Sequence, residues 1–165
     1  EVGNDAARFY YVMRKSEQHI DFDLDLAVSQ SKDNAVYYIQ YAHARVNRMV
    51  DVRAPEKNIA FDRTQLAHYD VSILVSNTET ELLAKLAAYP EIVARAANSY
   101  EPHQIGNYLK ELAALFHGWY AQDDVKILDE QNIALSQARL VLSLNVQQVL
   151  KNGLTLLGVS APESM

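Results

Sequence analysis

Hydrophobic positions recur at helical spacing over most of the chain, and the clearest case is residues 33–50. Asp33 and Asn34 favour the start of a helix, so about 17 residues of helix are predicted from there. At about 100° per residue, one arc of about 80° collects apolar side chains: Val36, Ile39, Val46 and Val50. A second arc, more than about 100° away, collects Tyr38, Tyr41, Arg45 and Arg48. The helix is therefore expected to bury one edge and to carry rings and guanidinium groups on another.

The arc of tyrosines and arginines has two interpretations. Aromatic rings that stack on bases, next to cations that hold phosphates, suit a reader of single-stranded RNA. The alternative is that the tyrosines pack under a neighbouring helix while the arginines are solvated. Aromatic stripes at helical spacing are usually core, so the pattern alone favours packing.

The amino-terminal third predicts one helix and one extended segment. Asn4 or Asp5 is expected to cap a helix that runs to about Lys15. Apolar and acidic residues then alternate over residues 21–27, DFDLDLA, and this period of two predicts extended chain. The alternating aspartates lack the central glycine and terminal glutamate of a calcium loop, so no metal site is expected there.

The rest of the chain predicts helices joined by one long connection. Residues 51–77 are irregular, with a helical turn expected near residues 62–68. Thr78 and Glu81 fit a capping box for the next helix, and Pro90 and Pro102 each fit a helix start. Asn132 is expected to cap the last long helix, which ends at Gly158. The prediction is an all-α up-and-down bundle of five or six helices, preceded by a short mixed segment of about 30 residues.

Composition places the chain among soluble globular domains. It has 165 residues, of which 49% are hydrophobic and 22% charged, enough for one domain with a real core. It contains no run of about 18 apolar residues and no signal peptide, so no membrane association is expected. The first residue is not methionine, which suggests a piece of a longer chain. Cysteine is absent, which excludes disulfides and thiol catalysis.

The net charge of −6 argues against nucleic-acid binding through bulk electrostatics, because phosphate neutralisation needs clustered cations. Any RNA contact must therefore come from local patches, with the acidic residues 79–91 facing away. The candidate cations are Arg8, Arg14, Lys15, Arg45, Arg48, Arg53, Arg139 and Lys151.

No catalytic constellation is apparent. The chain has no dinucleotide fingerprint, no phosphate loop and no nucleophile elbow. None of the five histidines forms the i, i+4 pair of a zinc helix, and His43, beside the apolar arc, is expected to be a hydrogen-bonded core residue. The sequence predicts no catalytic and no metal-ligating residue, which indicates a binding module.

Several motifs, in order, resemble the anticodon-binding domain of arginyl-tRNA synthetases. The stretch KDNAVYYIQYAHARV, residues 32–46, is similar to that domain's signature. EVGNDAARFYYVMR and DFDLDLA before it, and YPEIVARAA, EPHQIGNYLKELAALFHGWY and NGLTLLGVSAPESM after it, follow the family's order. Residues 51–78 match poorly.

The resemblance implies a class I synthetase that joins arginine to its tRNA with ATP and magnesium, in a catalytic domain absent from this chain. Residues 1–32 would be a connector after that domain, and residues 33–165 a DALR-type helical bundle that grips the anticodon loop of tRNA(Arg). The family implies RNA-binding roles for the matching residues Tyr38, Tyr41, Arg45, Tyr120 and Met165, and the arc described above adds Arg48. The fragment itself would bind no cofactor, and a cytoplasmic monomer in contact with its own catalytic domain is expected.

Three positions depart from the family's pattern. Ala35 stands where proline is common, Gln147 where arginine is frequent, and Ser164 where arginine often precedes the final methionine. These departures remove cations or a rigid helix start, which weakens the expected contact with the RNA backbone. The competing hypothesis is a protein-interaction module that uses the same Tyr/Arg face, since both residue types are enriched at protein hot spots.

Overall fold

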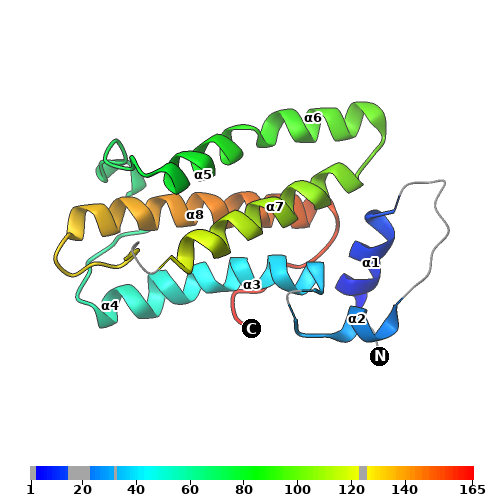
Figure 1. Cartoon of the computed structure of the whole chain (residues 1–165), viewed down its shortest axis with the longest axis horizontal. Coiled ribbons are helices and arrows are strands. Elements are labelled where there is room, and N and C mark those ends of the chain that lie inside the picture. The colour runs from blue at the N-terminus through cyan, green and yellow to red at the C-terminus, as the bar shows by residue number, and fades with distance from the viewer. Residues whose placement is uncertain (1–2, 15–22, 32, 123–125) are drawn as a thin grey trace.

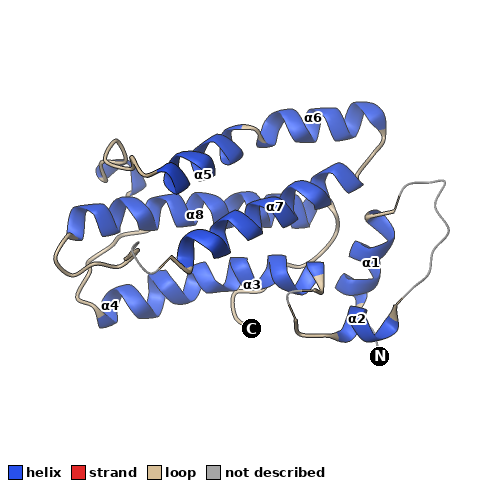
Figure 2. Ribbon diagram, viewed as in Figure 1, coloured by secondary structure: helices blue, strands red, loops and turns tan. Residues whose placement is uncertain are grey.

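The computed structural model describes residues 3–14, 23–31, 33–122 and 126–165. Its helices are α1 (Asn4–Val12), α2 (Leu24–Val28), α3 (Ala35–Arg48), α4 (Ala54–Glu56), α5 (Asn77–Ala87), α6 (Tyr89–Ser99), α7 (His103–Tyr120) and α8 (Ile133–Leu156). A π-helical turn, Met49–Arg53, joins α3 to α4, and Leu66–His68 form a 3-10 turn. The described residues contain no strand (Figure 2), so the all-α prediction is confirmed.

The bundle has an up-and-down arrangement (Figure 1). Helix α3 runs in one direction, α5 and α6 return one after the other, α7 runs parallel to α3, and α8 returns again. Helix α7 is central and packs against α3, α5, α6 and α8, while α1 packs at one end against α3 and α7. The up-and-down arrangement is therefore as predicted, with α5 and α6 following one another in the same direction.

The predicted apolar stripes form the core. On α7 the stripe Ile105, Leu109, Leu112, Phe116 and Trp119 is buried throughout. On α3 the same holds for Val36, Ile39 and Val46, and on the π-helical turn that follows for Val50. A Cβ at Gly153 of α8 would lie 2.6 Å from Leu109 Cδ2, so a side chain there would displace the buried Leu109 side chain of α7.

Most predicted helix ends are confirmed. Asn132 caps α8, since its Oδ1 accepts a hydrogen bond from Leu135 N at 3.2 Å. Pro90 lies in the first turn of α6, and Pro102 immediately precedes α7. Gly158 has a φ of 67° just after α8, a left-handed conformation that favours glycine over residues with a side chain.

Asn34 precedes α3 as expected, but its amide does not cap that helix. Asn34 Nδ2 instead donates to the carbonyl oxygens of Ala27 and Ser29, at 3.2 and 2.8 Å. Asn34 therefore ties the start of α3 to the end of α2.

Three predictions near the helix starts are wrong. Residues 24–28 are helical rather than extended, because Asp23 caps α2 by accepting a hydrogen bond from Leu26 N. Helix α1 is preceded by Gly3 and ends at Val12, earlier than expected; Lys15, Asp21 and Phe22 lie outside the described residues. The capping box at α5 is formed two residues earlier than predicted, by Ser76 and Glu79.

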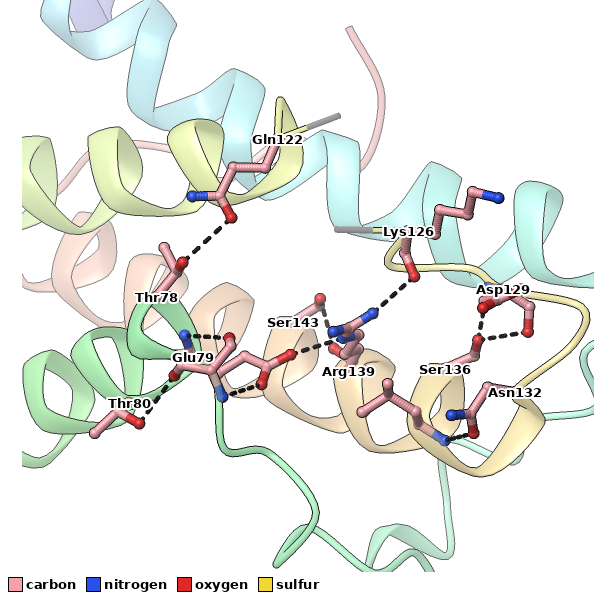
Figure 3. A network of polar contacts seen from close by, with 12 residues as sticks. Thr78, Glu79, Thr80, Gln122, Lys126, Asp129, Asn132, Ser136, Arg139 and Ser143 are labelled. Carbon is pink, nitrogen blue, oxygen red and sulfur yellow. Dashed lines mark hydrogen bonds and ion pairs between the residues drawn. The ribbon is translucent and has the colours of Figure 1, made fainter. Parts of the chain in front are cut away.

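Glu79 also makes a buried ion pair that joins α5 to α8 (Figure 3). Its Oε1 lies 2.7 Å from Arg139 Nε, and the Glu79 and Arg139 side chains are only 1% and 11% exposed. Arg139 donates a second hydrogen bond to the Lys126 carbonyl at 2.8 Å. The prediction that Arg139 belongs to a surface cation patch is therefore wrong, because its guanidinium is engaged in the core.

Candidate nucleic-acid interface

A groove of about 440 Å³ lies between α3, its π-helical turn, the end of α7 and the carboxyl-terminal residues 163–165. Five of the six residues predicted to bind RNA line this groove: Tyr41, Arg45, Arg48, Tyr120 and Met165. They come from three separate parts of the chain, so the fold brings them together. The sixth, Tyr38, does not line the groove.

Arg45 lies between two aromatic rings at one wall of the groove. Its Cζ is 4.5 Å from the ring centroid of Tyr41 on α3 and 4.5 Å from that of Tyr120 on α7. Its Nη2 also donates to the Tyr41 hydroxyl at 3.0 Å. A guanidinium plane suits such a position because it stacks on aromatic faces while its edge donates hydrogen bonds.

His117 of α7 accepts a hydrogen bond from Arg45. Arg45 Nη1 lies 3.0 Å from His117 Nδ1, and His117 Nε2 lies 3.2 Å from the carbonyl oxygen of Tyr38. Because a guanidinium only donates and a carbonyl only accepts, His117 must carry its proton on Nε2. Burial and the nearby Arg45 charge lower the pKa of His117, against the raising effect of the Tyr38 carbonyl. The imidazole is therefore neutral.

Tyr38 and Tyr41 occupy different environments, although both belong to the predicted arc. The Tyr38 ring is half-buried against the core, with its centroid 4.5 Å from that of His117. The Tyr41 and Tyr120 side chains remain 37% and 38% exposed. The packing interpretation of the arc thus holds for Tyr38, whereas Tyr41 remains partly exposed.

Tyr37 stacks on Tyr41 and was not among the residues predicted for the site. Its ring lies nearly parallel to that of Tyr41, with centroids 6.0 Å apart and 6° between the planes. Tyr37, Tyr41 and Arg45 are spaced by four residues, which places them in one row along α3. That spacing is the pattern by which the row could have been found.

Arg48 is one of two exposed arginines that line the groove. No hydrogen bond or ion pair holds its guanidinium within the part of the chain that the structure describes. Arg53, by contrast, pairs with Glu56 at 3.1 Å. Asp51 and Glu163 also line the groove, so its charge is mixed.

The carboxyl-terminal segment, residues 158–165, folds back along α3. Gln40 Nε2 donates to the Ser160 carbonyl at 3.0 Å, His43 Nδ1 to the Pro162 carbonyl at 2.8 Å, and Asn47 Nδ2 to the Glu163 carbonyl at 3.3 Å. The three donors, at positions 40, 43 and 47, form a polar row at helical spacing that the sequence analysis did not single out.

His43 is a hydrogen-bonded core residue, as predicted. Its side chain is buried and its pKa is lowered, chiefly by that burial. Gln147, the departure noted on the last helix, is also buried and donates to the His43 carbonyl at 3.1 Å. Gln147 therefore holds α8 to α3 instead of facing the groove.

The described residues offer no candidate metal site and no candidate membrane span. These residues contain no group of three or more His, Asp or Glu side chains arranged to hold a metal ion. None of their helices has the length and apolar character needed to cross a membrane.

Comparison with known proteins gives a consistent result. The family model described as the DALR anticodon binding domain matches residues 39–165. The chain is 71% identical to the arginine–tRNA ligase of Acinetobacter baylyi and 55% identical to that of Psychrobacter cryohalolentis, over 100% of this chain in both cases. It spans 27% and 28% of their lengths, about a quarter of each relative.

Solved structures show the same likeness in three dimensions. The arginyl-tRNA synthetase of Thermus thermophilus superposes with a TM-score of 0.77 at 29% identity, over 98% of this chain and 26% of that one. A crystal structure from Campylobacter jejuni, also described as an arginyl-tRNA synthetase, gives 0.84 at 26% identity, over 100% of this chain and 34% of that one.

Proposed function

The chain belongs to the DALR anticodon binding domain family, and we propose that it is the anticodon-binding part of an arginine–tRNA ligase. Residues 33–165 are the RNA-binding bundle, and residues 1–32 are the connector to a catalytic domain outside this chain. The observation that carries the proposal is the convergence of Tyr41, Arg45, Arg48, Tyr120 and Met165 on one groove.

The ligand is the anticodon loop of tRNA(Arg), whose unpaired bases can be splayed out and stacked. The exposed surfaces of Tyr41 and Tyr120 offer stacking platforms, and Arg48 meets the backbone. Met165 is 54% exposed at the rim, where a flexible thioether can lie against a base. Tyr38 acts indirectly in this scheme, because its ring is half-buried behind His117.

Binding of a synthetic RNA hairpin with the anticodon stem-loop of an arginine tRNA tests the proposal. The logarithm of the affinity should fall linearly with the logarithm of the salt concentration, with a slope that reports the number of phosphate contacts. Arg48→Gln should make that slope shallower by about one unit. If the same face binds a protein instead, the chain should not bind the RNA hairpin. Its affinity for that protein should then change little with salt concentration.

Catalysis belongs to the missing domain, which uses ATP and magnesium; this chain binds neither, and acts as a monomer in the cytoplasm. Arginine-dependent exchange between ATP and pyrophosphate should therefore be absent from the isolated chain. Detectable exchange by the pure chain would contradict this assignment.

A further inference from the structure

The carboxyl-terminal segment is attached to α1 as well as to α3. The Asp5 carboxylate of α1 accepts hydrogen bonds from the Ser160 backbone N at 3.1 Å and from the Ser160 hydroxyl. Gln40 Nε2 of α3 donates to the same carboxylate at 2.9 Å and to the Ser160 carbonyl at 3.0 Å. Three elements far apart in the sequence thus meet at Ser160, five residues before the carboxyl terminus.

A second contact lies one turn further along α1. The Arg8 side chain lies against Gly158, where a Cβ would be 2.5 Å from Arg8 Nη1. Gly158 is the point at which the chain leaves α8, with a φ of 67°. Helix α1 therefore contacts the segment at its start and again at Ser160.

The segment follows α8, and its last residues line the groove. Beyond Ser160 it follows α3 through the hydrogen bonds of Pro162 to His43 and of Glu163 to Asn47. Ser164 and Met165 then line the groove beside Tyr41. Terminal residues fray unless something holds them, so the contacts at Ser160, Pro162 and Glu163 together set where Met165 lies.

From this geometry we infer that Asp5 is a positioning residue for the groove: through Ser160 it fixes the course of the carboxyl-terminal segment and thereby the place of Met165. Its consequence for RNA affinity rests on the proposed function of the groove. Asp5 itself lies at the far end of this series of contacts and does not line the groove. Helix α1 thus reaches the end of the groove through the segment.

A mutant cycle with the end of the segment tests this dependence. Asp5→Ala should weaken hairpin binding by about five-fold, the effect of losing a small hydrogen-bond network. In a chain that lacks Ser164 and Met165, Asp5→Ala should change the dissociation constant by less than about two-fold. Asp25→Ala, which removes the same charge from an exposed position on α2, controls for electrostatics and should leave affinity unchanged. Ser160→Ala removes the hydroxyl that donates to Asp5. Because Ser160 is exposed, this variant tests the same contact even if the Asp5 variant fails to fold.

A measurement without RNA separates this inference from the proposed function. The chain has three methionines, Met13, Met49 and Met165, so selective labelling of the methionine methyl groups gives three NMR resonances, and the truncated chain assigns that of Met165. Asp5→Ala and Ser160→Ala should both move the Met165 resonance toward its value in a disordered peptide. The resonance of Met49, which is buried, should stay in place.

Two results would overturn the inference: an unmoved Met165 resonance in both variants, or an Asp5→Ala effect on affinity that persists undiminished in the truncated chain. Failure of the wild-type chain to bind the hairpin would refute the proposed function instead. The Met165 resonance would still decide whether Asp5 positions the segment.

Discussion

Arg45 donates a hydrogen bond to Nδ1 of His117 at 3.0 Å, which requires His117 to be neutral and protonated on Nε2. The imidazole therefore orients the guanidinium that lies between the rings of Tyr41 and Tyr120. Protonation of His117 would convert the acceptor into a donor and place two cations in contact. The order of this wall of the groove thus depends on pH.

Acidification should weaken both folding and RNA binding. The pKa values of His117 and His43 are lowered from the ordinary value of 6.5. A histidine with a lowered pKa contributes stability that is complete above about pH 6.5 and is lost as the pH falls toward the folded-state pKa. The free energy of unfolding, measured with urea between about pH 7.5 and pH 5.5, should therefore decrease on the acidic side.

His117→Asn isolates the contribution of His117 to this pH dependence. The amide keeps one acceptor for Arg45 and one donor for the Tyr38 carbonyl, but it does not titrate in this range. The variant should lose less affinity for the hairpin on acidification than the wild type does. An identical loss in the two proteins would show that His117 is not the group responsible.

Arg45→Lys should disturb the groove although it preserves the charge. An ammonium group cannot lie flat between two rings while donating to both Tyr41 and His117. We expect the free energy of unfolding to fall by about 1 kcal/mol, together with weaker hairpin binding. Arg48→Lys is the matched control, because Arg48 is exposed and its replacement should change stability by less than about 0.5 kcal/mol.

Tyr41→Ala should chiefly reduce RNA affinity, whereas Tyr38→Ala should chiefly reduce stability. Tyr41 lines the groove and is 37% exposed, so its loss should weaken hairpin binding by about 1–3 kcal/mol, the value of one base–aromatic stack. Tyr38 is half-buried against the core, so its loss should chiefly lower stability, by about 2 kcal/mol. Equal affinity losses with unchanged stability in both variants would contradict this division.

Much of the fold follows from local patterns in the sequence. The arcs of α3 and the stripe of α7 report burial directly, because a helix has a fixed period of about 3.6 residues. Prolines and Asn132 mark helix starts for local reasons of backbone geometry. The alternation over residues 21–27 predicted extended chain, but Asp23 caps a helix at residues 24–28 instead. Such competition between nearby residues is settled by contacts that periodicity does not contain.

The site was only partly predictable, because its geometry depends on long-range contacts. The two faces of α3 identified Tyr41, Arg45 and Arg48, whereas Tyr120 and Met165 came from resemblance to a family. Nothing local shows that Arg139 is engaged by Glu79, 60 residues away, or that Asp5 meets Ser160. Nor does anything local show that Tyr38 and Tyr41 both lie against His117, a residue of another helix.

The Glu79–Arg139 ion pair should respond asymmetrically to loss of its partners. Burial disfavours the charged form of Glu79, but hydrogen bonds from Arg139 and Ser76 outweigh that cost and hold its pKa below the ordinary value. Arg139→Met should cost about 3–5 kcal/mol of unfolding free energy at neutral pH, because it leaves the carboxylate buried and unpaired. The cost should shrink as the pH falls toward 4.5, the ordinary pKa of a glutamate, since protonation of Glu79 then relieves the uncompensated charge.

Glu79→Gln completes this test, because the amide oxygen keeps the capping box at Ser76 while removing the charge. Added to Arg139→Met, it should restore part of the lost stability, so that the double variant unfolds with a smaller penalty than the sum of the two single ones. Neither residue lines the groove, and hairpin affinity should stay constant in all three variants under conditions where they are folded. Strictly additive penalties measured by urea unfolding would show that the two side chains do not stabilise each other, and a change in affinity would show that α5 and α8 influence the groove from a distance.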